Sequence, residues 1–452
     1  MHRIALICAL AICAHATAMD FTVDSALDTL DANPGDGLCA DAEGACTLRA
    51  AIQETNALPG ADTIAIPAGT YAIALAGDDD TAASGDLDID DDLTLTGAGS
   101  DATTIDGAAL DRVFEIFATS PPRDVRFDAL TIRNGALSGG GLVAGGAGVH
   151  VAENVTLQLD DVVIRDNRTT SRFGGVAIDA EGCVIGMHVR ILDNVDTEQT
   201  GSGSAVAAIH AHDGANACLD LADSEIRGNR ADYAGAVESD FAPITLRRLL
   251  ISDNEARFAG ALLLNLAADT LLENVTISGN RGNPGAILND GGSHLTIVHG
   301  TITANGPSNG SSVVGGIQDV HGGFGLTFLS NTILSGNGPG FLADDCSNAT
   351  SAGGGNIVGD SAHCAFDADP SDQLDIDPTL SALADNGGFT RTQLPGAAAI
   401  DHAQAAACVA TDQRALSRPV DGDGDGDPVC DVGAVEVQVT IDAIFADGFE
   451  AG

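Results

Sequence analysis

Near the C-terminus, aspartate alternates with glycine in the stretch VDGDGDGDPVCD, residues 420–431. Its regularly spaced carboxylates are Asp421, Asp423, Asp425 and Asp427. Glycine lets the backbone curl, so neighbouring carboxylates can face one point, and Ca²⁺ takes several oxygen ligands. The stretch begins like an EF-hand loop, but Val432 stands where that loop has a bidentate Glu. We expect either a solvated acidic turn or a weak structural Ca²⁺ site without a catalytic role.

A second candidate for metal binding is the stretch AIHAHDG, residues 208–214, in which His210 and His212 lie two apart. On a strand such residues share one face, so both imidazoles could bind one metal ion. Asp213 follows directly. The sequence shows no third ligand, however, which favours ordinary loop histidines over a metal site.

Catalysis on polysaccharides would need clustered carboxylates and, in a lyase, a base that abstracts a proton. The chain has acidic clusters at Asp86, Asp88, Asp90, Asp91, Asp92, Asp160, Asp161, Asp344 and Asp345. Lysine is absent, so a base would be His or one of the arginines Arg165, Arg227, Arg247 and Arg248. A solvated strand face is the simpler interpretation of these arginines. The chain also has no Trp on which a sugar ring could stack.

Eight cysteines follow residue 18, and an even number in an exported protein indicates disulfides. Many connectivities are open to eight cysteines. Proximity in the sequence suggests the pairs Cys39–Cys46, Cys183–Cys218, Cys346–Cys364 and Cys408–Cys430. Cysteine-based metal binding is the weaker alternative, because no C-x-x-C spacing occurs.

These groups must be positioned by a repeated motif that ends in asparagine, as in LDDVVIRDN (159–167), LADSEIRGN (221–229) and LENVTISGN (272–280). The repeated asparagines are Asn167, Asn194, Asn229, Asn254, Asn280, Asn305 and Asn337. Their shortest spacing is 25 or 26 residues. A period in this range is typical of a solenoid.

Within each repeat, apolar and polar residues alternate, as in Val275, Thr276 and Ile277. This alternation predicts strands with one buried face, and we expect Val162 and Ile164 to point inward as well. About three short strands per repeat predict an all-β fold, the right-handed parallel β-helix, with roughly ten to twelve rungs at ~4.8 Å each. Asparagine suits the corner because it tolerates the left-handed conformation and can form stacked amide ladders.

Ahead of the repeats, the stretch TLRAAIQETNALPG (47–60) has helical spacing of Leu48, Ala51, Ile52 and Thr55. A solenoid exposes unpaired strand edges at its ends, and these must be covered. The sequence therefore predicts a short N-terminal helical cap.

The charge balance is 65 acidic against 19 basic residues, a net charge of −46. Such a surface repels nucleic acid and anionic membranes, whose binding depends on basic side chains. At the N-terminus, an apolar stretch (4–14) follows Arg3, and Ala16-Thr17-Ala18 forms an A-x-A cleavage site. This pattern predicts a signal peptide cleaved after Ala18, and hence a secreted or outer-surface protein. The apolar stretch is too short to span a bilayer, and no later segment reaches that length.

Two stretches carry a resemblance to known families. CTLRAAIQETNA (46–57) resembles the CSLREA-type motif of secreted bacterial proteins, with Thr47 for Ser and Ala50 for Glu. LADNGGFTRTQLPGAAAID (383–401) and CDVGAVE (430–436) resemble the choice-of-anchor Q region. The resemblance implies export and a pectate-lyase-like right-handed β-helix, but it implies little about activity.

The expected organisation is a signal peptide (1–18), an N-terminal cap (19–61), β-helix repeats (62–340), a choice-of-anchor Q-like region (341–437) and a tail (438–452). We expect a secreted or cell-surface, non-catalytic, adhesin-like or scaffold protein. Its partner would be an extracellular glycan or surface component, and its only candidate cofactor is Ca²⁺. The alternative is a carbohydrate-active enzyme on the same solenoid, which would show a groove lined by convergent Asp, Arg and aromatic side chains.

Overall fold

The computed structural model describes residues 18–438, apart from 78, 119, 139–144, 171–173, 198–206, 213, 267–268, 309–313, 321–325 and 339–343. The expected signal peptide, except for Ala18, and the C-terminal tail beyond Gln438 lie outside the described residues. No helix in the described part of the chain is long and apolar enough to cross a membrane.

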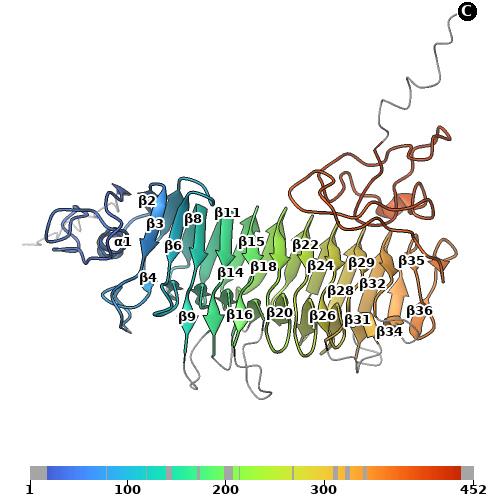
Figure 1. Ribbon diagram of the computed structural model, residues 1–452, viewed down its shortest axis with the longest axis horizontal. Coiled ribbons are helices and arrows are strands. Elements are labelled where there is room, and N and C mark those ends of the chain that lie inside the picture. The colour runs from blue at the N-terminus through green and yellow to red at the C-terminus, as the bar shows by residue number, and fades with distance from the viewer. Residues whose placement is uncertain are drawn as a thin grey trace, which may run out of the picture.

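The described chain winds into a rod in which strands stack in parallel, each turn on the turn before (Figure 1). What we call the first ladder comprises β1 (Asp20–Thr22), β2 (Asp62–Ile66), β5 (Leu93–Gly97), β8 (Arg123–Arg133), β11 (Val155–Arg165), β14 (Cys183–Met187), β18 (Cys218–Ala222), β21 (Ile244–Arg247), β24 (Asp269–Glu273), β28 (His294–Val298), β32 (Leu326–Ser330), β34 (Asp344–Ala352) and β36 (Cys364–Asp367). From β2 to β32 this ladder has ten strands, within the number that the repeat predicts.

Two further ladders complete each turn. The second ladder contains β3 (Gly69–Ala72), β6 (Thr103–Asp106), the C-terminal halves of β8 and β11, β15 (Arg190–Leu192), β19 (Glu225–Arg227), β22 (Leu250–Ser252), β25 (Thr276–Ser278), β29 (Thr301–Thr303), β33 (Ile333–Ser335), β35 (Ile357–Val358) and β37 (Gln373–Leu374). The third ladder contains β4 (Leu87–Ile89), β7 (Phe114–Ile116), β10 (Val149–Val151), β13 (Ile178–Ala180), β17 (Ile209–His212), β20 (Val237–Asp240), β23 (Leu262–Asn265), β27 (Ile287–Asn289) and β31 (Val314–Asp319). Short strands pair at the turns: β9 (Ala136–Leu137), β12 (Arg168–Thr169), β16 (Val195–Asp196), β26 (Arg281–Gly282) and β30 (Gly306–Pro307). The predicted all-β parallel solenoid is confirmed.

The interior of the rod is aliphatic, as the strand alternation predicts. Val162, Ile164, Val275 and Ile277 are all buried. Each turn alone is too thin to bury its apolar face, so the core forms only by stacking. The ladder also takes in β1 and β34 to β37, which lie outside residues 62–340.

The repeated asparagines form one continuous amide ladder, which confirms that they stack along one edge. From Asn167 to Asn305, each side-chain Nδ2 donates to the Oδ1 of the next asparagine at 2.9 Å. At the last asparagine, Asn337, the Nδ2 donates to the carboxylate of Asp345 at 2.8 Å. The ladder is fully buried, and every amide is satisfied by a neighbouring turn.

The prediction that these asparagines adopt the left-handed conformation is wrong, because that conformation occurs one residue earlier. The residue with positive φ is the one before each asparagine: Asp166, Asp193, Gly228, Asp253, Gly279, Ala304 and Gly336. That residue makes the sharp corner, and the asparagine that follows can then direct its amide inward along the stack. The side-chain hydrogen bonds, and not tolerance of positive φ, explain why asparagine recurs there.

The N-terminal end is covered by α1 (Leu48–Ala57), which confirms the predicted helical cap (Figure 1). Thr47 is its N-cap and accepts a hydrogen bond from the backbone N–H of Ala50. The sequence did not reveal the role of Arg49, which is fully buried and pairs with Asp28 at 2.6 Å.

The C-terminal region after β37 contains few regular elements, among them the short helix η2 (Ala405–Ala407), and folds back along the rod (Figure 1). Gln413 inserts between turns: it donates to the carbonyl of Leu249 at 3.0 Å and accepts from the hydroxyl of Thr276 at 2.6 Å. Further along, the N–H of Ala434 donates to Thr301 at 2.9 Å. The region thus bonds to turns far from it in the sequence.

Candidate functional site on the outer face of the third ladder

A row of ionisable side chains runs along the third ladder. Strand pairing puts six residues of successive strands in register: Asp88, Glu115, His150, Asp179, His210 and Glu238. We call these six the polar row. Their neighbours along each strand face the apolar core, so the row points to the outer face. The row ends at Leu263, the next residue in register.

Most of the polar row is nevertheless buried, because turns fold over this face. Asp88, Asp179 and Glu238 are each no more than 4% exposed. The backbone N–H groups of Gly145 and Gly175 both donate to Asp179 at 2.9 Å. Burying so many ionisable groups costs stability unless they are paired, so their pairing decides what the row can do.

At the N-terminal end of the row lies a pocket of about 240 Å³. Its lining is Asp79, Asp86, Leu110, Asp111, Arg112, Glu115, Ala136, Leu137 and Ser138. Arg112 bridges the pocket: its Nε lies 3.3 Å from Asp86, and its Nη1 lies 3.1 Å from Glu115. The carboxylates of Asp86, Asp88 and Glu115 approach one another within 4.8 Å. We call this arrangement the acidic pocket.

Burial dominates the electrostatics of the acidic pocket. It raises the pKa of Asp86 to about 8, with a further contribution from the charge of Asp88 and an opposing one from Arg112. Burial likewise raises the pKa of Asp88 to about 7. The arrangement therefore holds two carboxyl groups whose raised pKa values favour the protonated form near neutral pH. Such a pair can in principle exchange a proton with a ligand.

In the middle of the row, Asp179 lies among three histidines. Its Oδ1 is 3.2 Å from Nδ1 of His210 and 3.4 Å from Nε2 of His212. Its Oδ2 is 3.6 Å from Nδ1 of His150. The rings of His210 and His212 stack with centroids 4.0 Å apart. On the far side of His210, Nε2 lies 3.5 Å from Asp240. We call Asp179, His210, His212, Glu238 and Asp240 the histidine cluster.

The sequence identified His210 and His212 but not their partners. Asp179 comes from the preceding turn, 31 residues earlier, and Asp240 from the following turn. Inserted loops make the spacing irregular at this point, so alignment on the asparagines alone does not show the register. Aligning the strands AID (177–179), AIH (208–210) and AVE (236–238) on their small first residue would have shown it. Asp213, the residue considered beside the histidines, lies outside the described residues.

The candidate calcium loop is only partly assembled. Asp421 and Asp423 come within 4.8 Å of Asp401, a residue that the sequence did not suggest. Asp425 and Asp427 are exposed and do not join this group. Calcium binding at the four alternating aspartates stays a prediction.

The arginines considered as possible bases pair with nearby acids. Arg247 lies 3.1 Å from Asp220, and Arg248 lies 2.6 Å from Asp223, both on the preceding turn. Arg165 and Arg227 likewise pair with acidic neighbours. None of these four arginines lines the acidic pocket.

Four disulfides stabilise the described chain: Cys39–Cys46, Cys183–Cys218, Cys346–Cys364 and Cys408–Cys430. These are the sequence-neighbour pairs. Cys183 and Cys218 lie directly opposite each other on β14 and β18, so this disulfide joins two turns. The bond holds β14 and β18 together although a long insertion separates the two strands in the sequence.

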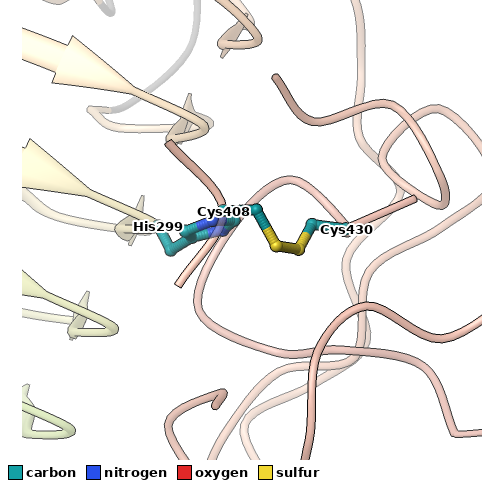
Figure 2. A group of neighbouring side chains, drawn as sticks. All are labelled: His299, Cys408 and Cys430. Atoms are coloured by element: carbon teal, nitrogen blue, oxygen red, sulfur yellow. A yellow bond between two sulfur atoms is a disulfide. The ribbon is translucent and has the colours of Figure 1, made fainter. Parts of the chain in front are cut away.

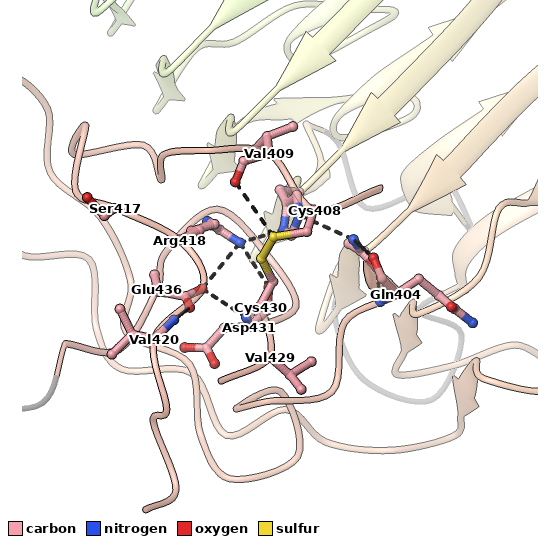
Figure 3. The surroundings of a disulfide bond; sticks show 12 residues. Gln404, Cys408, Val409, Ser417, Arg418, Val420, Val429, Cys430, Asp431 and Glu436 are labelled. Atoms are coloured by element: carbon pink, nitrogen blue, oxygen red, sulfur yellow. Dashed lines mark hydrogen bonds and ion pairs between the residues drawn. A yellow bond between two sulfur atoms is a disulfide. The ribbon is translucent and has the colours of Figure 1, made fainter. Parts of the chain in front are cut away.

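The disulfide Cys408–Cys430 lies against His299 of the solenoid, and together they resemble a metal-binding group (Figure 2). The two sulfur atoms are bonded to each other, so neither is a thiolate that could bind a metal. Burial, with the nearby charge of Arg418, holds the pKa of His299 well below its usual range, so the imidazole is neutral. Arg418 donates to the carbonyl of Asp431 at 2.9 Å and lies 3.7 Å from Glu436 (Figure 3). The disulfide, His299 and Arg418 thus help to hold the C-terminal region against the rod.

Comparisons with known proteins add little to this description. No family model matches the chain, and no curated protein matches it. Among solved structures, the chain is similar to pectate lyase Pel9A, with a TM-score of 0.46 and 13% sequence identity over 94% of this chain and 98% of that one. The fold and the site define a parallel β-solenoid with a buried polar row. The likeness to CSLREA-type and choice-of-anchor Q proteins stays a resemblance of short motifs.

Proposed function

We propose that the chain is an exported, non-catalytic β-solenoid that serves as an adhesin-like or scaffold protein outside the cell. Four disulfides are consistent with an oxidising, extracellular environment. The rod offers long lateral faces, and its net charge of −46 favours neutral or cationic partners over acidic ones. An extracellular glycan or another surface component fits this chemistry.

The observation that carries the proposal is the position of Arg112 between Asp86 and Glu115. A glycosidase places its two carboxyl groups on either side of the scissile bond, about 5 to 9.5 Å apart. In the acidic pocket the guanidinium group of Arg112 instead lies between two of the carboxyl groups, 3.3 Å from Asp86 and 3.1 Å from Glu115. None of the described residues that line the pocket is aromatic, so none of them can stack against a sugar ring. This arrangement favours a structural ion cluster over a catalytic centre.

One observation favours a second function, a glycoside hydrolase that uses the same pocket. The raised pKa values of Asp86 and Asp88, about 8 and about 7, are those of a general acid that works near neutral pH. If a substrate displaced Arg112, the pocket would offer the protonated carboxyl of Asp86 as a general acid. This alternative predicts that either aspartate is essential for activity.

The two functions are separated by incubating the chain without its signal peptide with an array of immobilised glycans and a panel of soluble polysaccharides. The proposal expects binding without product. Release of reducing ends, or of unsaturated uronate ends from pectin or alginate, would overturn it. Loss of that release in Asp86→Asn or Asp88→Asn, with unchanged fold by circular dichroism, would assign the activity to the acidic pocket.

A further inference from the structure

The histidine cluster has the composition and spacing of a transition-metal site. Two imidazole nitrogens and a carboxylate oxygen converge: Nδ1 of His210 and Nε2 of His212 lie 3.2 and 3.4 Å from the same oxygen of Asp179. All three ligand atoms lie within 4.8 Å of one another. In a tetrahedral site with metal–ligand distances of roughly 2.0–2.2 Å, neighbouring ligand atoms are roughly 3.3–3.6 Å apart. Each of the two nitrogens therefore lies at about the distance from the carboxylate oxygen that separates two ligands of a single ion.

The groups around these three side chains would support them as ligands. A metal-bound histidine usually gives its other ring nitrogen to a carboxylate, which fixes its orientation. His210 has this partner, because its Nε2 lies 3.5 Å from Asp240. The carboxylate of Asp179 is held from behind by the N–H groups of Gly145 and Gly175. The side chains thus do not depend on an ion to keep their positions.

An independent observation is a buried carboxyl oxygen of the cluster that has no hydrogen-bond partner. Glu238 is 4% exposed, and its Oε2 has no hydrogen-bond partner. It lies in one group with His210 and Asp240, with ligand atoms within 4.8 Å. No described arginine forms an ion pair with Asp179, Glu238 or Asp240. Two buried acids and the half-buried Asp240 thus lie together without an arginine partner among the described residues, which favours binding of a positive ion.

We propose that Asp179, His210 and His212 bind one divalent transition-metal ion of the Zn²⁺ class, with Asp240 positioning His210. Nitrogen and carboxylate ligands select such ions over Ca²⁺, which takes oxygen ligands. Three protein ligands leave a fourth position for a water molecule or another ligand. The site joins three successive turns through β13, β17 and β20, so the bound ion stabilises the middle of the rod. The proposal is independent of whether the chain acts on glycans.

A proton is the competing occupant of this cluster. Burial alone would lower the pKa of His210, but its hydrogen bonds to Asp179 and Asp240 raise it to about 10. In that case an imidazolium lies between two carboxylates and must lose its proton before a metal can bind. Metal titration distinguishes the two, because metal binding to a protonated histidine must release that proton.

The test uses the intact chain, freed of metal with a chelator and titrated with Co²⁺ by absorption and with Zn²⁺ by calorimetry. We expect one ion per chain, a visible Co²⁺ spectrum that Zn²⁺ abolishes, and no heat with Ca²⁺ at the same concentration. His212→Gln should weaken binding at least 10-fold. Asp240→Asn, which leaves all three ligands in place, should weaken it about 10- to 100-fold. Zn²⁺ should raise the unfolding temperature of the unaltered chain but not that of His212→Gln.

The matched control is His294→Gln, because His294 also pairs with an aspartate, Asp269, at 3.0 Å, but on the exposed face of the first ladder. This variant should bind one ion with unchanged affinity. Failure of the unaltered chain to bind one equivalent would overturn the proposal, as would unchanged affinity in His212→Gln. Equal weakening by His294→Gln would show that the ion binds elsewhere. If His212→Gln does not fold, unchanged affinity in Asp240→Asn is the result that overturns the proposal.

Discussion

Replacing a central amide of the asparagine ladder tests the energetics of the rod most directly. The Oδ1 of Asn254 accepts from the N–H and the Nδ2 of Asn229, at 3.0 and 2.9 Å. Its own Nδ2 donates to the carbonyl of Ile226 and to Asn280, both at 2.9 Å. All four hydrogen bonds are buried. Asn254→Ala removes them, and at about 0.5–1.5 kcal/mol each the free energy of unfolding should fall by about 2–6 kcal/mol.

Asn254→Asp keeps the size and shape of the side chain but should be worse than Ala at neutral pH. One carboxylate oxygen still accepts the two bonds from Asn229. The other faces the carbonyl of Ile226 and the Oδ1 of Asn280, which are both acceptors. A buried, unpaired negative charge costs several kcal/mol, so burial should raise the pKa of the new carboxyl. Once protonated, the carboxyl can donate one of the two lost bonds.

The sign of the pH dependence follows from this raised pKa. The folded state then binds a proton at a pH where the unfolded state has lost it, so the variant is relatively most stable below the unfolded pKa. Its stability should fall as the pH rises to the folded pKa and stay low above it. Relative to Asn254→Ala, the Asp variant should therefore gain stability between pH 8 and pH 5.

The assay is urea unfolding followed by circular dichroism at both pH values, with hydrogen exchange of the Asn229 amide as a local readout. Exposed Asn216→Asp serves as the control, because a surface substitution usually changes stability by no more than about 0.5 kcal/mol. An Asn254→Asp variant as stable as the unaltered chain, or one whose deficit does not depend on pH, would refute the reasoning.

Three further predictions concern the acidic pocket, the acidic loop and the C-terminal region. Because burial raises the pKa of Asp86 to about 8, folding stability should decline as the pH rises from about 4 to about 8. Urea unfolding of Asp86→Asn should show a smaller decline, and a pH profile identical to that of the unaltered chain would contradict this. If Ca²⁺ binds the acidic loop, calorimetry at millimolar Ca²⁺ should show heat of binding. Asp423→Ala should abolish this heat and Asp425→Ala should largely preserve it, because of these two residues only Asp423 joins the group around Asp401. No heat, or a larger loss in Asp425→Ala than in Asp423→Ala, would end the calcium hypothesis. Gln413→Ala removes three buried hydrogen bonds and should expose the C-terminal region to limited proteolysis while the rod stays intact; unchanged cleavage would mean that the other contacts suffice.

The repeat explains why so much of the fold could be predicted. Apolar alternation around Val275 and Ile277 and the regular return of asparagine together require stacked strands, because a single turn cannot bury its own apolar face. The helix at Leu48–Ala57 was predictable for a similar reason, since its apolar spacing and its stop signal are local. In each case the pattern can be recognised from residue spacing along the sequence, without knowing which residues of different turns are in contact.

What the sequence did not show depends on contacts between turns. Asp179 and Asp240 reach the two histidines only through the strand register, which inserted loops conceal. The bond from Gln413 to Leu249 spans 164 residues and leaves no periodic trace. The sequence also led to the wrong residue for the positive φ. The asparagine recurs because of its side-chain hydrogen bonds, whereas the positive φ belongs to the residue before it, whose type varies from turn to turn.

The asparagine ladder also gives the rod an electrical direction. Every amide from Asn167 to Asn337 is oriented the same way, with its N–H toward the C-terminal turn and its oxygen toward the N-terminal turn. Aligned amide dipoles add, as they do in a helix, and hydrogen bonds in a chain polarise one another. The carboxylate of Asp345 accepts a hydrogen bond at the positive end of this macrodipole. Its negative charge stabilises that end, as an anion does at a helix N-terminus. Burial raises the pKa of Asp345 to about 6, so mild acid neutralises the negative charge at the positive end of this macrodipole.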